Sequence, residues 1–157
     1  MSLYLNYPIN LESKPTHIAW SNTEIPILAV VTNNKKINFY LDEACNIKEK
    51  NIVKDKLITT IVWHPNTMVL SYGLEDGTIG IWIDSDNYNQ DNNSFHESKI
   101  TNIKFNNNGN RLISVDANNY IAVWFFEGSL TKLCTYSQKH SIENILFPAF
   151  NIKRYIE

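Results

Sequence analysis

Short runs of alternating apolar and polar residues, separated by polar turns, cover most of the chain. In one such run Ile61 and Trp63 point to one face while Thr60 and Val62 point to the other, which is the two-residue period of a β-strand. Residues 79–83 repeat this alternation, and helical spacing is not sustained in any segment. The pattern predicts an all-β protein.

The strand-like runs recur at a nearly constant interval. Three sets of equivalent positions show it, namely Trp20, Trp63, Phe105 and Phe147; Ile37, Ile79 and Ile121; and Leu28, Leu70 and Leu112. The aromatic positions are 43, 42 and 42 residues apart, and the other two sets step by 42. A period of about 40–45 residues is typical of β-propeller blades. The alternative, a β-sandwich of unrelated strands, has no reason to keep one register at several positions at once.

Polar turns occupy the same place in each repeat, at residues 33–35, 75–77 and 117–119. They contain Asn, Asp and Gly, which tolerate the left-handed backbone that tight hairpins require. The sequence therefore predicts three hairpins in register.

The stretch from His96 to Trp124 resembles a WD repeat. In that family a His, a Ser or Thr, an Asp in the turn and a Trp form a buried hydrogen-bonded set within each blade. The resemblance assigns these places to His96, Ser114, Asn118 and Trp124. Since Asn118 stands where the family has Asp, we expect His96 to lack a negatively charged partner.

The middle repeat keeps the other half of the WD pattern, with Asp76 in the turn and Trp82 on the strand, but has Lys54 in the place of the His. Large residues at equivalent positions of a repeat are typical of a core. We therefore expect a structural role, not ligand stacking, for the four tryptophans, Trp20, Trp63, Trp82 and Trp124.

A narrower resemblance covers nearly the whole chain. The order of short motifs, among them 62–65 (VWHP), 109–112 (GNRL) and 139–140 (KH), is similar to the first propeller of the intraflagellar transport protein 140 family. Members of that family carry two WD propellers followed by helical repeats, and serve retrograde ciliary transport as large subunits of complex A. The resemblance implies other complex A subunits as protein partners, no cofactor, and a location in the cytoplasm, the cilium or flagellum and the basal body.

The predicted fold is a partial WD-repeat β-propeller of about three to four four-stranded antiparallel blades. We expect it to span residues 1–148, with units near 16–58, 59–99 and 100–142, the start of a fourth at 143–148, and an atypical tail at 149–157. Rings of this family commonly have seven blades, so we expect an open ring that another chain could complete. Residues 3–5 are expected to serve as a closing strand, and residues 87–94 as a solvated loop.

The composition of the chain argues against several classes of function. A net charge of −2 provides no broad positive field, which argues against nucleic acid as a partner. No apolar run approaches bilayer-spanning length, so no membrane insertion is expected. Cys45 and Cys134 have no metal-ligand spacing, which favours a reduced setting and no metal site.

No catalytic motif is recognisable around the four histidines, and the five glycines form no phosphate-binding loop. His17 and His64 are expected at exposed turns. We therefore predict a non-catalytic protein-binding scaffold, with contacts on the loops at 32–36, 84–94 and 127–130. The alternatives are a general cytosolic WD adaptor and a fragment without independent function.

Overall fold

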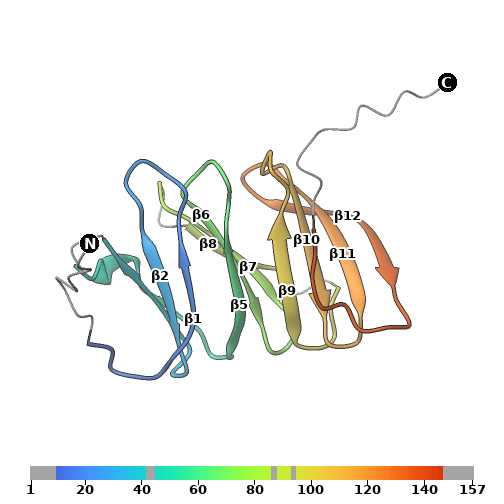
Figure 1. The fold of residues 1–157 in the computed structure, drawn as a ribbon, viewed down its shortest axis with the longest axis horizontal. Coiled ribbons are helices and arrows are strands. Elements are labelled where there is room, and N and C mark those ends of the chain that lie inside the picture. The colour runs from blue at the N-terminus through green and yellow to red at the C-terminus, as the bar shows by residue number, and fades with distance from the viewer. Residues whose placement is uncertain (1–9, 42–44, 86–87, 93–94, 147–157) are drawn as a thin grey trace, which may run out of the picture.

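The computed structural model describes residues 10–41, 45–85, 88–92 and 95–146. These ranges contain twelve strands in three four-stranded antiparallel sheets, which stand side by side like the blades of a propeller (Figure 1). Within these ranges the one helical element is a short 3-10 turn, η1, at Lys48–Lys50. The prediction of an all-β partial propeller is confirmed.

In each sheet the strands are paired in chain order, so neighbouring strands are joined directly. Blade 1 consists of β1 (Pro15–Trp20), β2 (Leu28–Thr32), β3 (Lys36–Tyr40) and β4 (Ile52–Val53). Blade 2 consists of β5 (Ile58–Trp63), β6 (Val69–Leu74), β7 (Ile79–Ile83) and β8 (Tyr88–Asn92). Blade 3 consists of β9 (Ile100–Phe105), β10 (Arg111–Asp116), β11 (Tyr120–Phe126) and β12 (Leu130–Ser137).

The turns between the second and third strands have the left-handed backbone that the sequence predicts. Their third residues, Lys35, Gly77 and Asn119, have φ angles of 67°, 91° and 63°. Gly77 is also required by space, because a Cβ there would lie 2.3 Å from the carbonyl oxygen of His96. The three predicted hairpins are present, and the turn of blade 2 packs against the chain that enters blade 3.

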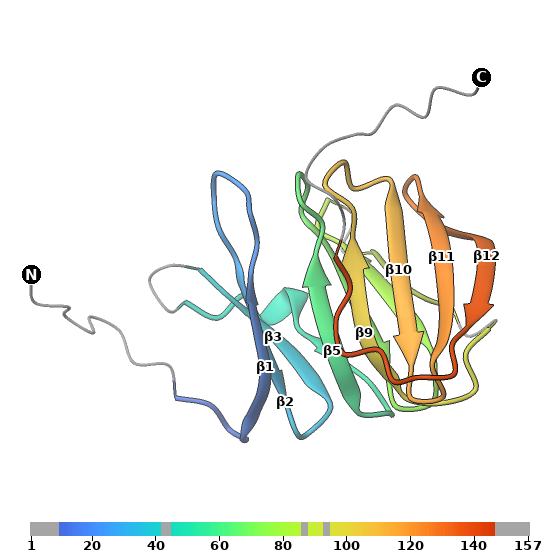
Figure 2. The same cartoon turned by 45° about the vertical axis from the view of Figure 1, so that its right-hand side comes forward.

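Stacking of the blades supplies the core. The inner strand β5 lies between β1 and β9 in both views (Figures 1 and 2). Between blades 1 and 2, the ring of Phe39 stacks on Trp82 at 4.4 Å between centroids, and Trp63 packs edge-on to both rings. The Trp63 indole also donates a hydrogen bond of 2.9 Å to the carbonyl oxygen of Ala19. Each blade thus buries a face that it could not cover alone.

A second core lies between blades 2 and 3 and includes Ile79, Leu112 and Trp124. At its edge His64 packs against Phe105 and Phe126, with centroid distances of 5.1 and 5.7 Å. The expectation that His64 is exposed is wrong, since it is only 7% exposed. Its Nδ1 accepts the backbone N–H groups of two turn residues, so the turn position is right but the ring points inward.

The expectation of a loop at 87–94 is also wrong, because β8 occupies Tyr88–Asn92 within it and pairs with β7 along its length. This strand is polar because it is the outermost strand of its blade. A third departure concerns Trp20, which is 51% exposed while the other three tryptophans are buried. Trp20 lies on β1, and the described residues include no further sheet beyond that face of blade 1.

After β12 the chain turns back toward the inner strands. Figure 2 shows this segment, in red, crossing in front of blade 3. The ammonium group of Lys104 on β9 donates a hydrogen bond of 2.9 Å to the carbonyl oxygen of Ile145, which holds the segment beside β9. Phe147, the expected closing strand at 3–5 and the tail at 149–157 lie outside the described residues.

Candidate functional site: a buried polar network in blade 3

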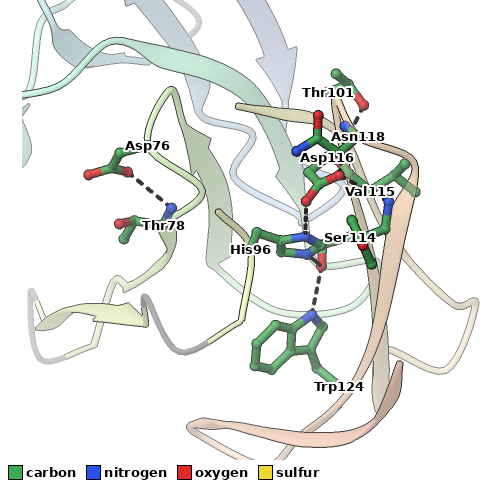
Figure 3. A network of polar contacts seen from close by, with 10 residues as sticks. Asp76, Thr78, His96, Thr101, Ser114, Val115, Asp116, Asn118 and Trp124 are labelled. Carbon is green, nitrogen blue, oxygen red and sulfur yellow. Dashed lines mark hydrogen bonds and ion pairs between the residues drawn. The ribbon is translucent and has the colours of Figure 1, made fainter. Parts of the chain in front are cut away.

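Four side chains of blade 3 form a continuous hydrogen-bonded chain inside the protein (Figure 3). His96 comes from the segment that leads into β9, Ser114 and Asp116 from β10, and Trp124 from β11. The Trp124 indole donates to Ser114 Oγ at 2.8 Å, and Ser114 Oγ lies 2.7 Å from His96 Nε2. On the other side of the imidazole, Nδ1 lies 3.0 Å from Asp116 Oδ2.

The donors and acceptors of this network fit a neutral imidazole. Burial lowers the pKa of His96, against the opposing effect of the Asp116 hydrogen bond and charge. With the proton on Nδ1, the ring donates to the Asp116 carboxylate and its Nε2 accepts the Ser114 hydroxyl proton. The hydroxyl oxygen in turn accepts the indole N–H of Trp124. Each of these polar groups has a partner, as burial requires.

The expectation that His96 has no negative partner is wrong. Asp116, the last residue of β10, provides the carboxylate, and its other oxygen accepts the backbone N–H groups of Asn118 and Tyr120 at 2.9 and 3.0 Å. Asn118 takes part through its backbone, as one of the groups that orient Asp116. The carboxylate thus comes from position 116, two residues before the predicted position 118. The Asp116 side chain, at the end of β10, folds back over the turn that follows.

Blade 2 has different polar contacts at the equivalent positions. The Asp76 carboxylate accepts the backbone N–H of Thr78 at 3.0 Å and so stabilises its own turn. Lys54, at the position of His96, forms an ion pair of 2.8 Å with Asp91 on β8. Its ammonium group also lies 4.9 Å from the centroid of the Tyr72 ring.

Tyr72 completes this second network. Its hydroxyl donates a hydrogen bond of 2.6 Å to Asp91 Oδ1, and it also contacts Asn89. Burial and the neighbouring Asp91 raise the pKa of Tyr72, so its hydroxyl stays protonated. Tyr72 is the register equivalent of Ser114, and Gly80, opposite it on β7, leaves room for the ring. Tyr72 and Asp91 were not predicted from the sequence, although the 42-residue spacing between Tyr72 and Ser114 was a usable signal for Tyr72.

The order Ser114, His96, Asp116 matches the hydroxyl, base and acid of a nucleophilic triad in its contacts. A catalytic triad must be accessible to its substrate, but these three residues are only 0%, 5% and 1% exposed. The Trp124 indole already occupies the hydroxyl oxygen. A substrate has no access to this serine, and the network is suited to bracing a blade.

Metal-ligand clusters and membrane-spanning helices are both absent from the described ranges. Among those residues, no three His, Cys, Asp or Glu side chains gather closely enough to hold a metal ion. None of the helical segments found there has the length and apolar character needed to cross a membrane.

Stacked four-stranded blades, one of them with a Trp–Ser–His–Asp network, define a WD-type β-propeller segment. The family model described as "IFT140 first beta-propeller" matches residues 2–153, and the chain belongs to this family. This membership connects it with intraflagellar transport and the cilium.

The fold is also similar to a chain in the crystal structure of an active polycomb repressive complex 2 in the basal state, with a TM-score of 0.63. That match covers 75% of this chain and 27% of the other, at 18% sequence identity. At this identity the likeness concerns the fold. The chain spans about a quarter of the length of the protein it matches.

Proposed function

We propose that this chain is a non-catalytic protein-binding module of the intraflagellar transport complex A. The family match over residues 2–153 carries the proposal. The burial of the Ser114–His96–Asp116 network supports a scaffold over an enzyme, because this nucleophile–base–acid arrangement has no room for a substrate. The partners would be other complex A subunits, and the location the cytoplasm, the cilium or flagellum and the basal body.

The division of the chain belongs to the same proposal. Residues 1–148 would form one propeller segment with units near 16–58, 59–99 and 100–142 and a fourth starting at 143–148, followed by a separate tail at 149–157. The bounds of the three sheets and the position of Ile145 beside β9 support this division. The four tryptophans, Asp76 and the residues of the blade 3 network would act as structural residues of the blades.

A further blade or another chain would complete the ring. The large apolar residues left exposed on blades 1 and 3, among them Ile18 at 70% and Tyr136 at 56%, support this. Trp20 supports it as well. Trp20 is the blade 1 equivalent of Trp63, whose indole donates a hydrogen bond to the preceding blade. A monodisperse, cooperatively unfolding monomer of the chain would contradict this part of the proposal.

The test is affinity purification of the chain, tagged at its chromosomal locus, from ciliated cells. We expect complex A subunits to copurify, and the tag to lie at the basal body and along the cilium. A matched strain with the tag on an unrelated WD protein is the control. Recovery of cytosolic proteins without complex A subunits would overturn the transport role and favour a general WD adaptor.

A further inference from the structure

A cleft of about 640 Å³ lies at the boundary between blades 1 and 2. Its walls come from the β1–β2 loop, the β5–β6 loop and Asp84 just after β7. Figure 1 shows the two loops close together at the same end of their sheets. The amide of Asn22 donates a hydrogen bond of 3.2 Å to the carbonyl oxygen of Pro65, which ties the loops together across the boundary. The cleft is therefore built by two blades.

The repeat register explains why this boundary is hollow. Between blades 2 and 3 the equivalent space is filled by His64 and Phe126, which pack with Phe105. Their counterparts one repeat earlier are Ser21 and Asp84. Equivalent backbone hydrogen bonds establish this register. Ser21 and His64 each donate an N–H across their own loop, and Asp84 and Phe126 each donate an N–H to the loop between the first two strands of their own blade. Two rings at one boundary are replaced by a hydroxyl and a carboxylate at the other.

The β1–β2 loop is also longer than its counterparts. Seven residues separate the paired residues Trp20 and Leu28, whereas six separate the equivalent pairs, Trp63 and Leu70, and Phe105 and Leu112. This loop carries Ile25, which is 68% exposed and forms part of the cleft wall. The half-buried thioether of Met68 lies 3.2 Å from the Thr23 hydroxyl and gives the cleft a second apolar surface. The loop therefore presents an apolar side chain that no core contact requires.

The charged side chains that line the cleft are acidic. Glu24 and Asp84 line it, and none of the described residues along its walls is basic. The ammonium group of Lys50 pairs with Asp84 from outside the cleft. Glu24 is exposed and forms no ion pair among the described residues. A cationic group that entered beside Ile25 would meet a free carboxylate.

We propose that this cleft binds a segment of a partner protein in which an aromatic side chain stands next to an arginine or lysine. The aromatic ring would take the space that His64 and Phe126 fill one boundary later, against Ile25 and Met68. The cation would pair with Glu24. This inference rests on the proposed protein-binding function and specifies the kind of partner that one surface fits.

The experiment is a titration of the 15N-labelled full chain with the capped dipeptide acetyl-Phe-Arg-amide, followed by NMR. We expect saturable shifts confined to the amide signals of residues 22–25, 66–68 and 84. Acetyl-Phe-Glu-amide and acetyl-Ala-Arg-amide should each bind about two- to fivefold more weakly, as loss of one exposed ion pair or one apolar contact implies.

Variants with matched controls locate the site. Glu24→Lys and Ile25→Ser should weaken binding, whereas Glu127→Lys and Val53→Ser, which alter an exposed acid and an exposed apolar residue elsewhere, should not. Asp84→Phe restores the filling found one boundary later and should also prevent binding. Absent or scattered shifts, or equal affinity in Glu24→Lys, would overturn the inference.

Purification of complex A subunits with the Glu24→Lys chain separates this inference from the proposed function. If the Glu24→Lys chain recovers the subunits undiminished and the unaltered chain does not bind the dipeptide, the inference about the cleft is contradicted and the proposed function is not. Failure of the unaltered chain to recover these subunits contradicts the proposed function, while specific dipeptide binding would still support the cleft.

Discussion

The Nδ1 atom of His96 lies 3.0 Å from Oδ2 of Asp116, and both side chains are buried. This pair joins the segment entering blade 3 to the end of β10, whose turn the same carboxylate also fixes. One carboxylate thus orients both the imidazole and a hairpin turn.

Asp116→Ala should lower the free energy of unfolding by about 2–4 kcal/mol, because it leaves the imidazole N–H and two backbone N–H groups without an acceptor. Chemical denaturation measures the change. Asn118→Ala is the control and should change the value by less than about 0.5 kcal/mol, since its backbone N–H remains. Equal losses in the two variants would contradict the assignment of the acid to Asp116.

Lys54 and Asp91 should show energetic coupling of about 1 kcal/mol, a modest value because Asp91 is 42% exposed. A double-mutant cycle with Lys54→Met and Asp91→Asn measures it. The coupling should decrease as salt concentration rises, since exposed charges are screened. Purely additive effects at low salt would show that the ion pair does not stabilise blade 2.

Gly80→Ala should lower the free energy of unfolding by about 1–3 kcal/mol, because the new methyl group overlaps the Tyr72 ring. The variant Tyr72→Ser with Gly80→Ala recreates the pair found in blade 3, Ser114 opposite Ala122. We expect Gly80→Ala to cost less in the Tyr72→Ser background than in the unaltered chain, because the methyl group then meets no ring. No effect of the single variant would mean that the ring has space to move.

The free energy of unfolding should fall as the pH drops below about 6.5. Burial lowers the pKa of His17, His64 and His96 from the ordinary value of 6.5, so the unfolded chain binds more protons in this range. The stabilisation is complete above the unfolded pKa and is lost as the pH approaches the lower folded values.

Denaturation midpoints between pH 7.5 and 5 measure this dependence. The slope should be smaller in His64→Asn, whose amide oxygen can accept the turn N–H groups that Nδ1 accepts. His140→Asn, at an exposed position, is the control. An unchanged slope in His64→Asn would contradict the contribution of that residue.

Trp20 should be the tryptophan most readily quenched by iodide, since it is 51% exposed and the other three are at most 7% exposed. Trp20→Phe should remove most of the quenchable fluorescence. Protection of Trp20 in the purified chain would indicate that another blade or chain covers this face of blade 1.

The blades, their register and their hairpin turns can all be read from the sequence alone. These features depend on local properties of the chain: the two-residue alternation, the 42-residue period, and residues such as Gly77 that adopt the left-handed backbone conformation at fixed places in the repeat. The WD-repeat spacing also pointed to His96, Ser114 and Trp124, whose side chains are joined by hydrogen bonds in the structure.

Which side chains contact one another depends on the folded arrangement of the blades. Asp116 reaches His96 because its strand end folds back over the turn, a direction that spacing does not encode. Lys54 forms an ion pair with Asp91 because the polar segment after β7 pairs with it as the edge strand β8. The cleft at Asp84 exists because side-chain volume at each boundary depends on residues from two repeats. Local alternation specifies strands, whereas contacts between blades depend on how far and in which direction side chains reach.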